Sequence, residues 1–218
     1  MADRSVHEFD AAVGLLLERL EREPDETALS RLLHTEVNGQ RLTHQEIASN
    51  VKLSLVGGMQ EPRDLIGLTT WALLTHPAQG AAVTADATLL KPAIEEVLRC
   101  YAPVGTATRQ VTRPTVLAGV PLERGALVGA VLASANRDER HWRDPERFDL
   151  HRAEGPHLAF AAGPHFCLGA WLGRQIAGMG IQLLLARLPN LRLAPGAPAT
   201  FHGWEFRGLR RLHVQWDS

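Results

Sequence analysis

The stretch from Phe160 to Gly169 reads FAAGPHFCLG, and it is the most informative part of the sequence. It places a single cysteine, Cys167, in a glycine-bracketed loop directly before an apolar segment that predicts a long helix. Backbone amides at a helix N-terminus stabilise a negatively charged sulfur atom. Gly163 and Gly169 permit the backbone angles and the close approach that aim amides at the sulfur. The stretch therefore predicts a thiolate at the start of a helix.

Two interpretations of Cys167 remain open from the residues alone. A single thiolate with no other soft ligand nearby is typical of an axial ligand of heme iron. A lone cysteine is, however, more often a small buried hydrophobic residue. The chain holds 2 cysteines, the other being Cys100. This number excludes a disulfide framework and a four-thiolate zinc site.

The composition bounds the class of protein. The chain has 218 residues, of which 45% are hydrophobic and 22% charged, and its formal net charge at pH 7 is -1. These values predict a globular chain of one domain or at most two. The balanced charge supplies no basic field, so nucleic acid is not expected as a partner. The polar N-terminus and the lack of a run of about 18 apolar residues predict no signal peptide and no membrane anchor, and we expect a cytoplasmic protein.

Periodicity predicts mostly helices. Apolar residues at helical spacing predict two helices before residue 35, and Thr43 and Glu46 form a capping box that starts a third. The apolar pattern continues past Gly57, Gly58 and Pro62, which predicts one long, locally distorted helix. Short strands at 115–118, 126–133 and 212–216 complete the prediction. The expected class is mainly α with a minor β part (α+β).

The stretch FAAGPHFCLG resembles the heme-binding loop of the cytochrome P450 family, whose pattern is F-x-x-G-x-[HR]-x-C-x-G. Every specified position matches, including Gly163 and Gly169. The resemblance implies a bound heme b, with Cys167 as the axial ligand of the iron. It also implies that Phe160 packs near the sulfur and that His165 binds a heme propionate. The alternative for His165 is a loop histidine exposed to solvent.

A second motif supports the same family. Glu96 and Arg99 match the family's E-x-x-R motif in its K helix, although this spacing alone also predicts an ordinary intrahelical salt bridge. Arg147 lies in a Pro-Glu-Arg-Phe sequence that resembles the family's P-x-R-F element. The resemblance implies that Glu96, Arg99 and Arg147 form a structural triad that braces the heme loop. It also makes Arg109 the candidate for a second propionate contact, with Arg113 as a competitor and an ordinary surface arginine as the alternative.

The long helix departs from the family pattern. The family's I helix usually carries [AG]-G-x-[DE]-T, in which an acid and an alcohol deliver protons to iron-bound dioxygen. Aligning Gly57 and Gly58 with this pattern puts Gln60 at the acid and Glu61 at the threonine. Our hypothesis is that the Glu61 carboxylate faces the distal heme pocket and does the acid and base work. The alternative is that Glu61 points to solvent and that ordered water serves instead.

The resemblance covers nearly the whole chain but only the C-terminal half of the family. We therefore expect a single truncated domain over 1–218 that lacks the family's N-terminal helices and lid. Three explanations remain open: the gene start is placed too late, the chain is a degraded remnant, or a partner supplies the missing N-terminal half. The expected parts are an I-helix-like segment at about 43–76, a K-helix-like segment at 91–101, the heme-binding loop at 160–169 and an L-helix-like segment at 168–188.

The resemblance implies a heme-thiolate monooxygenase. Such an enzyme inserts one oxygen atom of O2 into a small organic substrate with electrons from a redox partner, here expected to be a ferredoxin with its reductase. Peroxide-driven oxygenation is one alternative, because both proton-relay positions are changed. A non-catalytic heme-binding protein or remnant is the other, because half of the family's length has no counterpart.

Overall fold

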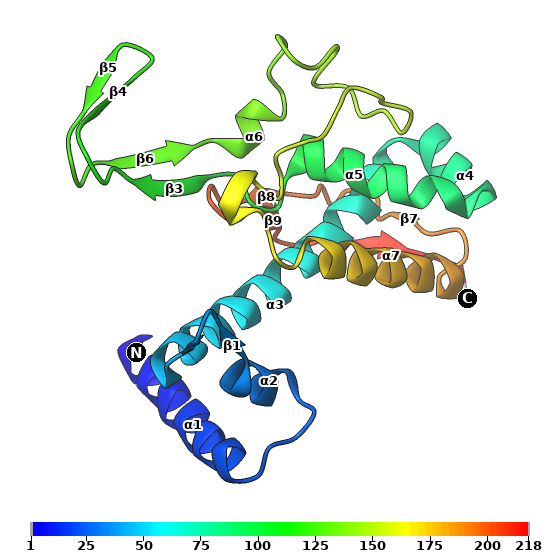
Figure 1. Ribbon diagram of the computed structural model, residues 1–218. Coiled ribbons are helices and arrows are strands. Elements are labelled where there is room, and N and C mark those ends of the chain that lie inside the picture. Colours follow the sequence, from blue (N-terminus) through cyan, green and yellow to red (C-terminus); the bar gives the residue numbers. More distant parts are fainter. Residues whose placement is uncertain (1, 218) are drawn as a thin grey trace. The chain divides into compact units, whose positions relative to one another are not determined.

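The computed structural model describes residues 2–217 (Figure 1). The chain is largely helical with small antiparallel strand pairs, so the expected α+β class is confirmed. The helices are α1 (Ala2–Arg22), α2 (Ala28–His34), α3 (His44–Thr75), α4 (Pro77–Ala85), α5 (Leu90–Tyr101), α6 (Leu132–Ala135) and α7 (Ala170–Arg187), with the short 3-10 helices η1 (Ala87–Leu89) and η2 (Gly163–His165).

The chain divides into two compact units, 1–58 and 59–218, and the division falls within α3. The first unit contains α1, α2, the hairpin of β1 (Glu36–Val37) and β2 (Gln40–Arg41), and the start of α3. Its core is a cluster of aliphatic side chains in which Leu17, Leu20 and Ile47 are almost completely buried.

The start of α3 confirms the predicted capping box. The Glu46 carboxylate accepts a hydrogen bond from the Thr43 backbone N–H at 2.8 Å, and the Thr43 hydroxyl accepts one from the Glu46 N–H at 3.2 Å. Two amides that a helix start leaves unpaired are thus satisfied. From there α3 continues without a break to Thr75 and includes Pro62 in its interior. Proline deprives the Gly58 carbonyl of its usual donor, and the helix continues because its later turns are held by the core of the second unit.

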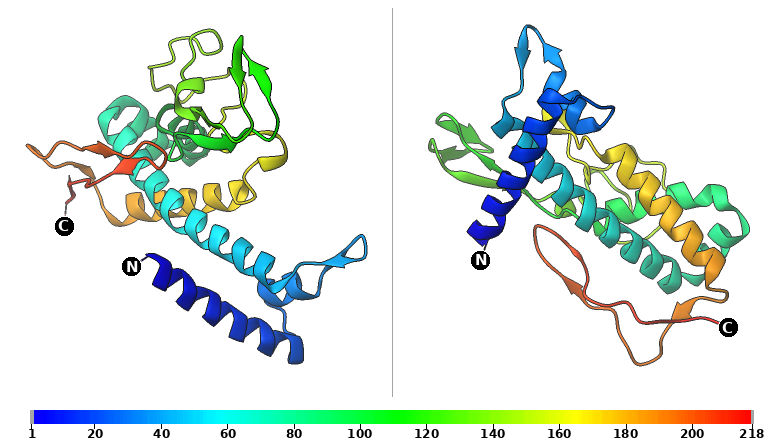
Figure 2. Two further views of the ribbon diagram at one scale, coloured as in Figure 1. Left: turned by 90° about the vertical axis from the view of Figure 1, so that its left-hand side faces the viewer. Right: turned by 90° about the horizontal axis from the view of Figure 1, so that it is seen from below.

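The second unit is built around the later part of α3 together with α5 and α7. Gly180 of α7 lets two helices approach, because a Cβ there would lie 2.7 Å from Ile66 of α3. Gly178 of α7 lies beside Ile94 of α5. The right-hand view of Figure 2 shows α7 running alongside this part of α3. The core is continuous from these helices to Phe148 and Leu150 in the long loop after α6.

The strands form two-stranded antiparallel pairs. The pair β3 (Ala107–Gln110) and β6 (Leu127–Ala130) has Ala107 opposite Ala130, and it is extended by β4 (Thr115–Leu117) with β5 (Val120–Leu122). Near the C-terminus, β7 (Arg192–Leu193) pairs with β10 (Val214–Gln215), and β8 (Phe201–His202) pairs with β9 (Gly208–Leu209). The predicted strands at 115–118, 126–133 and 212–216 therefore exist, each shorter than expected.

Candidate functional site

Cys167 lies in the loop between η2 and α7, drawn in yellow in Figure 1. Its thiol is free and its side chain is exposed, so the interpretation of Cys167 as a buried small hydrophobic residue is wrong. The Cys167 backbone N–H donates to the Phe160 carbonyl at 3.0 Å, which closes the loop. Gly163 adopts a φ of 71°, a left-handed conformation that glycine takes at little cost. Gly169 lies beside the thiol: a Cβ there would be 3.9 Å from the Cys167 sulfur, an ordinary van der Waals distance.

Large apolar side chains next to Cys167 are exposed in the chain by itself. The exposed fractions are 55% for Phe166, 99% for Leu168 and 71% for Trp171. Exposed apolar side chains around a thiol are suited to a flat, apolar ligand that coordinates sulfur. The residues present therefore fit a heme.

The structure brings some of the predicted heme contacts together and leaves others apart. Phe160 is partly buried and joins Cys167 through the backbone hydrogen bond. His165 ends η2 with its side chain exposed. Arg109 lies on β3, is exposed, and donates from its guanidinium to the Thr108 carbonyl at 2.9 Å. Arg113, the competitor, is also exposed.

Glu96 and Arg99 of α5 form a buried, two-pronged ion pair. The two Arg99–Glu96 hydrogen bonds both measure 2.8 Å, and the exposed fractions of the two residues are 1% and 4%. Arg99 also donates to the carbonyls of Asn136 and Pro145, each at 2.9 Å. The pair is thus no ordinary exposed salt bridge, because it ties α5 to the long loop that leads to the cysteine.

The third arginine of this cluster is Arg152, whereas the sequence predicted Arg147. Arg152 donates from Nε to the Glu96 carboxylate at 3.0 Å and is almost fully buried. The Arg147 side chain is exposed, and this residue contributes its backbone carbonyl, which accepts from Arg99 at 3.1 Å and from Arg152 at 2.9 Å. The loop turns at Asp144, and its path directs the carbonyl of Arg147 inward and its guanidinium to solvent.

A second ion-pair cluster was missed by the sequence analysis. The carboxylate of Glu95 accepts two hydrogen bonds from Arg174 of α7, at 2.6 and 2.8 Å, and one from His157 at 3.1 Å. Burial alone would raise the pKa of Glu95, but the hydrogen bonds and charges of Arg174 and His157 outweigh it and lower the pKa to about 2. Adjacent acids at 95 and 96 were the available signal, although nothing in the local sequence pairs Glu95 with α7.

Cys100, the other cysteine, is a structural residue. It is buried, and its sulfur lies 2.8 Å from an Arg99 nitrogen. Burial and the neighbouring Glu96 charge raise the pKa of its thiol to about 12, despite the opposing charge of Arg99. The thiol that is both free and accessible is thus Cys167.

Glu61 and Gln60 lie together on α3, and both are partly buried. The Oε2 atom of Glu61 is buried and has no hydrogen-bond partner among residues 2–217, contrary to the alternative in which the carboxylate points to solvent. Burial raises the pKa of Glu61; a hydrogen bond from its own backbone opposes the shift and the Asp64 charge adds to it. A carboxyl group with an unused buried oxygen and a raised pKa has the properties of a proton-transfer group.

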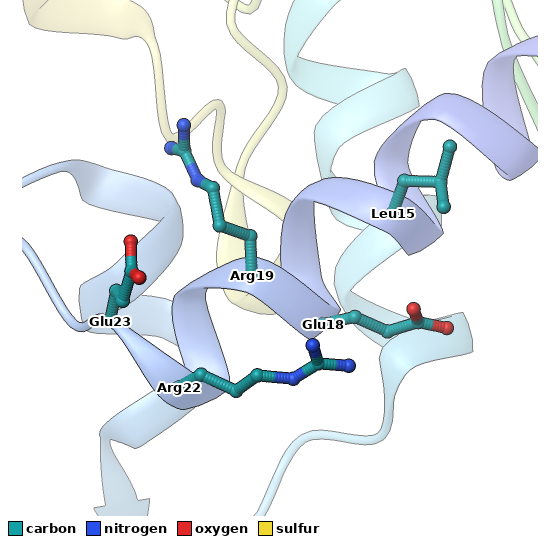
Figure 3. Close-up of a pocket in the computed structure, with 5 residues that line it drawn as sticks. All are labelled: Leu15, Glu18, Arg19, Arg22 and Glu23. Carbon is teal, nitrogen blue, oxygen red and sulfur yellow. The ribbon is translucent and has the colours of Figure 1, made fainter.

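A separate surface hollow of about 290 Å³ lies in the first unit. Its lining comes from one face of α1, formed by Leu15, Glu18, Arg19, Arg22 and Glu23 (Figure 3). None of the predicted site residues lines it. Within the described part of the chain, no helix combines the length and apolar character needed to span a membrane.

A mainly α fold with an accessible cysteine directly before a long helix is compatible with a heme-thiolate protein, and comparisons with known proteins give the family. The sequence pattern of the family described as Cytochrome P450 matches residues 82–192, which include both ion-pair clusters up to Arg174 and the cysteine loop. The chain belongs to the cytochrome P450 family.

Individual relatives are similar over nearly the whole chain. The chain is 38% identical to cytochrome P450 monooxygenase PikC of Streptomyces venezuelae, over 99% of this chain and 53% of the relative. It is 35% identical to 6-deoxyerythronolide B hydroxylase of Saccharopolyspora erythraea, over 93% and 51% respectively. The ligand-free structure of cytochrome P450 TbtJ1 superposes with a TM-score of 0.91 at 35% identity, over 99% of this chain and 57% of that one. The chain thus spans about half the length of the curated relatives it matches.

Proposed function

We propose that this chain holds a heme through Cys167 and supplies the oxygen-activating part of a cytochrome P450 monooxygenase. The observation that carries the proposal is the free, exposed thiol of Cys167 at the start of α7 in a chain of this family. The reaction is the insertion of one oxygen atom of O2 into a small organic substrate. Relatives named as a monooxygenase and as a hydroxylase support this reaction class.

The heme is a noncovalently bound heme b. Covalent attachment through two cysteines has no support, because Cys100 is buried against Glu96 and Arg99 while Cys167 serves as the axial ligand. The exposed side chains of His165 and Arg109 are available for the propionates. The bound heme supplies dioxygen activation, which the thiolate promotes by donating electron density.

Glu61 is the proton-transfer group of the site. Its buried Oε2 has room for a hydrogen bond that the described chain does not make, and its raised pKa favours holding a proton. Gln60, the neighbouring amide, orients water or substrate beside it and cannot itself exchange a proton near neutral pH. The reaction then consumes protons delivered through Glu61 in place of the family's acid and alcohol.

The helices α3, α5 and α7 correspond to the family's I, K and L helices, and together they form the part of the family's domain that this chain covers. The electrons come from a redox partner, here a ferredoxin with its reductase. The protein acts in the cytoplasm, and a polypeptide equivalent to the N-terminal half completes the substrate pocket. Relatives of similar sequence are named as a steroid C26-monooxygenase and as a 6-deoxyerythronolide B hydroxylase, so the proposal extends to the class of small organic substrates.

The proposal is tested by the carbon monoxide difference spectrum of the heme-supplemented, dithionite-reduced chain. A strongly red-shifted Soret band in the wild type and its loss in Cys167→Ser are the expected results. A folded wild type that binds heme without this band contradicts the proposal. The matched control is Cys100→Ser, which keeps the band because its thiol is not a ligand.

The role of Glu61 is tested by turnover of Glu61→Gln and Glu61→Ala with O2 and reductant, and in parallel with hydrogen peroxide. We expect both variants to lose at least about a hundredfold in rate, the lower end of the range for a lost general acid. Unchanged turnover and unchanged peroxide consumption would exclude Glu61 as the proton donor. Activity of the wild type with peroxide alone would identify the peroxygenase alternative.

A further inference from the structure

Two adjacent acids of α5, Glu95 and Glu96, form ion pairs with arginines that lie before and after the cysteine loop in the sequence. Glu96 binds Arg152, which precedes the loop in the chain. Glu95 binds Arg174, which follows it on α7, with nitrogen–oxygen distances of 2.6 and 2.8 Å. The first ion pair belongs to the cluster of Glu96, Arg99 and Arg152, and the second shares no side chain with that cluster. Only the second reaches a side chain of the loop itself.

Arg174 makes three kinds of contact at once. Its guanidinium holds the Glu95 carboxylate in a two-pronged arrangement and also donates to the Ala170 carbonyl at 3.1 Å. The central carbon of the same guanidinium lies over the Phe160 ring, 4.4 Å from the ring centroid. Such a cation–π contact is attractive and restrains the ring. The orientation of Phe160 is thus set from α7 and, through Glu95, from α5.

Phe160 connects this cluster to the thiol-bearing residue. Its carbonyl accepts the hydrogen bond from the Cys167 backbone N–H at 3.0 Å. Its ring lies 6.5 Å from the ring of Phe166, the residue before Cys167, measured between centroids. Any movement of Phe160 therefore changes both the backbone hydrogen bond and the packing beside the cysteine.

We propose that Arg174 is a positioning residue for Cys167. Held by Glu95, it clamps the Phe160 ring and thereby fixes the loop that presents the sulfur. The inference rests on the proposed role of Cys167 as the heme ligand. The guanidinium acts both through its charge, which pairs with Glu95, and through its planar group, which contacts the Phe160 ring. Lysine supplies the charge alone, so it should replace Arg174 only in part.

The first test is amide hydrogen exchange of the full chain without heme. We expect the Cys167 amide to exchange about tenfold faster in Arg174→Gln than in the wild type, because the loop opens more often when the clamp is lost. Arg174→Lys should fall between the two, and Glu95→Gln should shift in the same direction as Arg174→Gln. The matched control is Arg187→Gln, an exposed arginine in the last turn of the same helix, which should leave this amide unchanged.

The second test is the carbon monoxide difference spectrum of the heme-supplemented variants. Arg174→Gln should convert part of the red-shifted band to the band of a heme that lacks thiolate ligation, and Arg174→Lys should restore it only in part. If the wild type lacks the red-shifted band, the proposed function fails whatever Arg174 does. If the wild type shows it and Arg174→Gln changes neither the band nor the Cys167 amide, the inference is overturned. If far-UV circular dichroism shows that Arg174→Gln is unfolded, the inference is tested with Arg174→Lys and Glu95→Gln instead. The readouts are again the exchange of the Cys167 amide and the carbon monoxide difference spectrum.

Discussion

Glu96 and Arg152 form a buried ion pair, with 3.0 Å between the arginine Nε and the carboxylate and only 4% and 7% of the two side chains exposed. The pair is well satisfied: Glu96 also accepts from Arg99 and from the Asp149 backbone N–H, and Arg152 donates to the carbonyls of Arg143 and Arg147. A buried pair is stable only when its remaining donors and acceptors are used in this way. The pair joins α5 to the loop before the cysteine.

Replacing Arg152 should therefore be far more costly than replacing Arg147. Arg152→Ala leaves Glu96 with one arginine fewer in a buried site, and we expect the free energy of unfolding to fall by about 3 kcal/mol. Arg147→Ala keeps the backbone carbonyl that makes the contacts, so it should cost less than about 1 kcal/mol. Urea unfolding of the two variants measures both values. Equal losses would mean that the Arg147 side chain does take part in the cluster.

Glu95 predicts a loss of stability in acid. Its pKa is about 2 in the folded chain, against an ordinary value of 4.5, because the bonds from Arg174 and His157 outweigh the effect of burial. A lowered carboxyl pKa gives stability that is present above the unfolded value and is lost as the pH falls through the folded value. Between about pH 4.5 and pH 2 the wild type should lose stability more steeply than Glu95→Gln. Parallel curves for the two proteins, from urea midpoints measured across this window, would contradict the prediction.

Glu61 should make stability depend on pH in the opposite direction to Glu95. Burial raises its pKa, so the folded state disfavours the ionised carboxylate. A raised pKa gives stability that is present below the unfolded value and is lost as the pH rises through the folded value. Glu61→Gln should thus be more stable than the wild type at pH 7, and the difference should shrink on acidification below the ordinary carboxyl pKa. Thermal unfolding at pH 7 and at low pH tests this, with Glu18→Gln, at an exposed position of α1, as the control. A functional group kept at the expense of stability has this signature.

Local features of the fold were predictable, and long-range pairings were not. The capping box at Thr43 and the cysteine loop depend on neighbouring residues, which sequence patterns report directly. The helix through Pro62 was predictable because its apolar pattern resumes after the proline. The path of an irregular loop decides whether the side chain of Arg147 or that of Arg152 points towards Glu96. Sequence patterns do not report that path. Glu95 and Arg174 are 79 positions apart, so no periodicity connects them. The exposure of Cys167 likewise depends on tertiary packing.

The capping box offers a test of the first unit. Thr43→Ala removes the hydroxyl that accepts from the Glu46 N–H at 3.2 Å, and it should lower the free energy of unfolding by about 1 kcal/mol. Thr43→Ser keeps the hydroxyl and should stay close to the wild type. Urea unfolding monitored by far-UV circular dichroism compares the two. A serine variant as unstable as the alanine variant would show that the threonine methyl group, and not the cap, is what matters.

The two cysteines should differ sharply in reactivity. Cys167 is exposed and should react with a thiol reagent in the folded, heme-free chain. Cys100 is buried and its pKa is raised to about 12 by burial and by Glu96, so it should react only after unfolding. The Cys167→Ser variant should therefore lose the reaction of the folded chain, and Cys100→Ser should keep it.

Adding heme should protect the reactive thiol in proportion to heme bound, because coordination occupies the sulfur. Heme that binds while Cys167 remains fully reactive would place the heme on another ligand, and this outcome does not depend on finding a substrate or a redox partner.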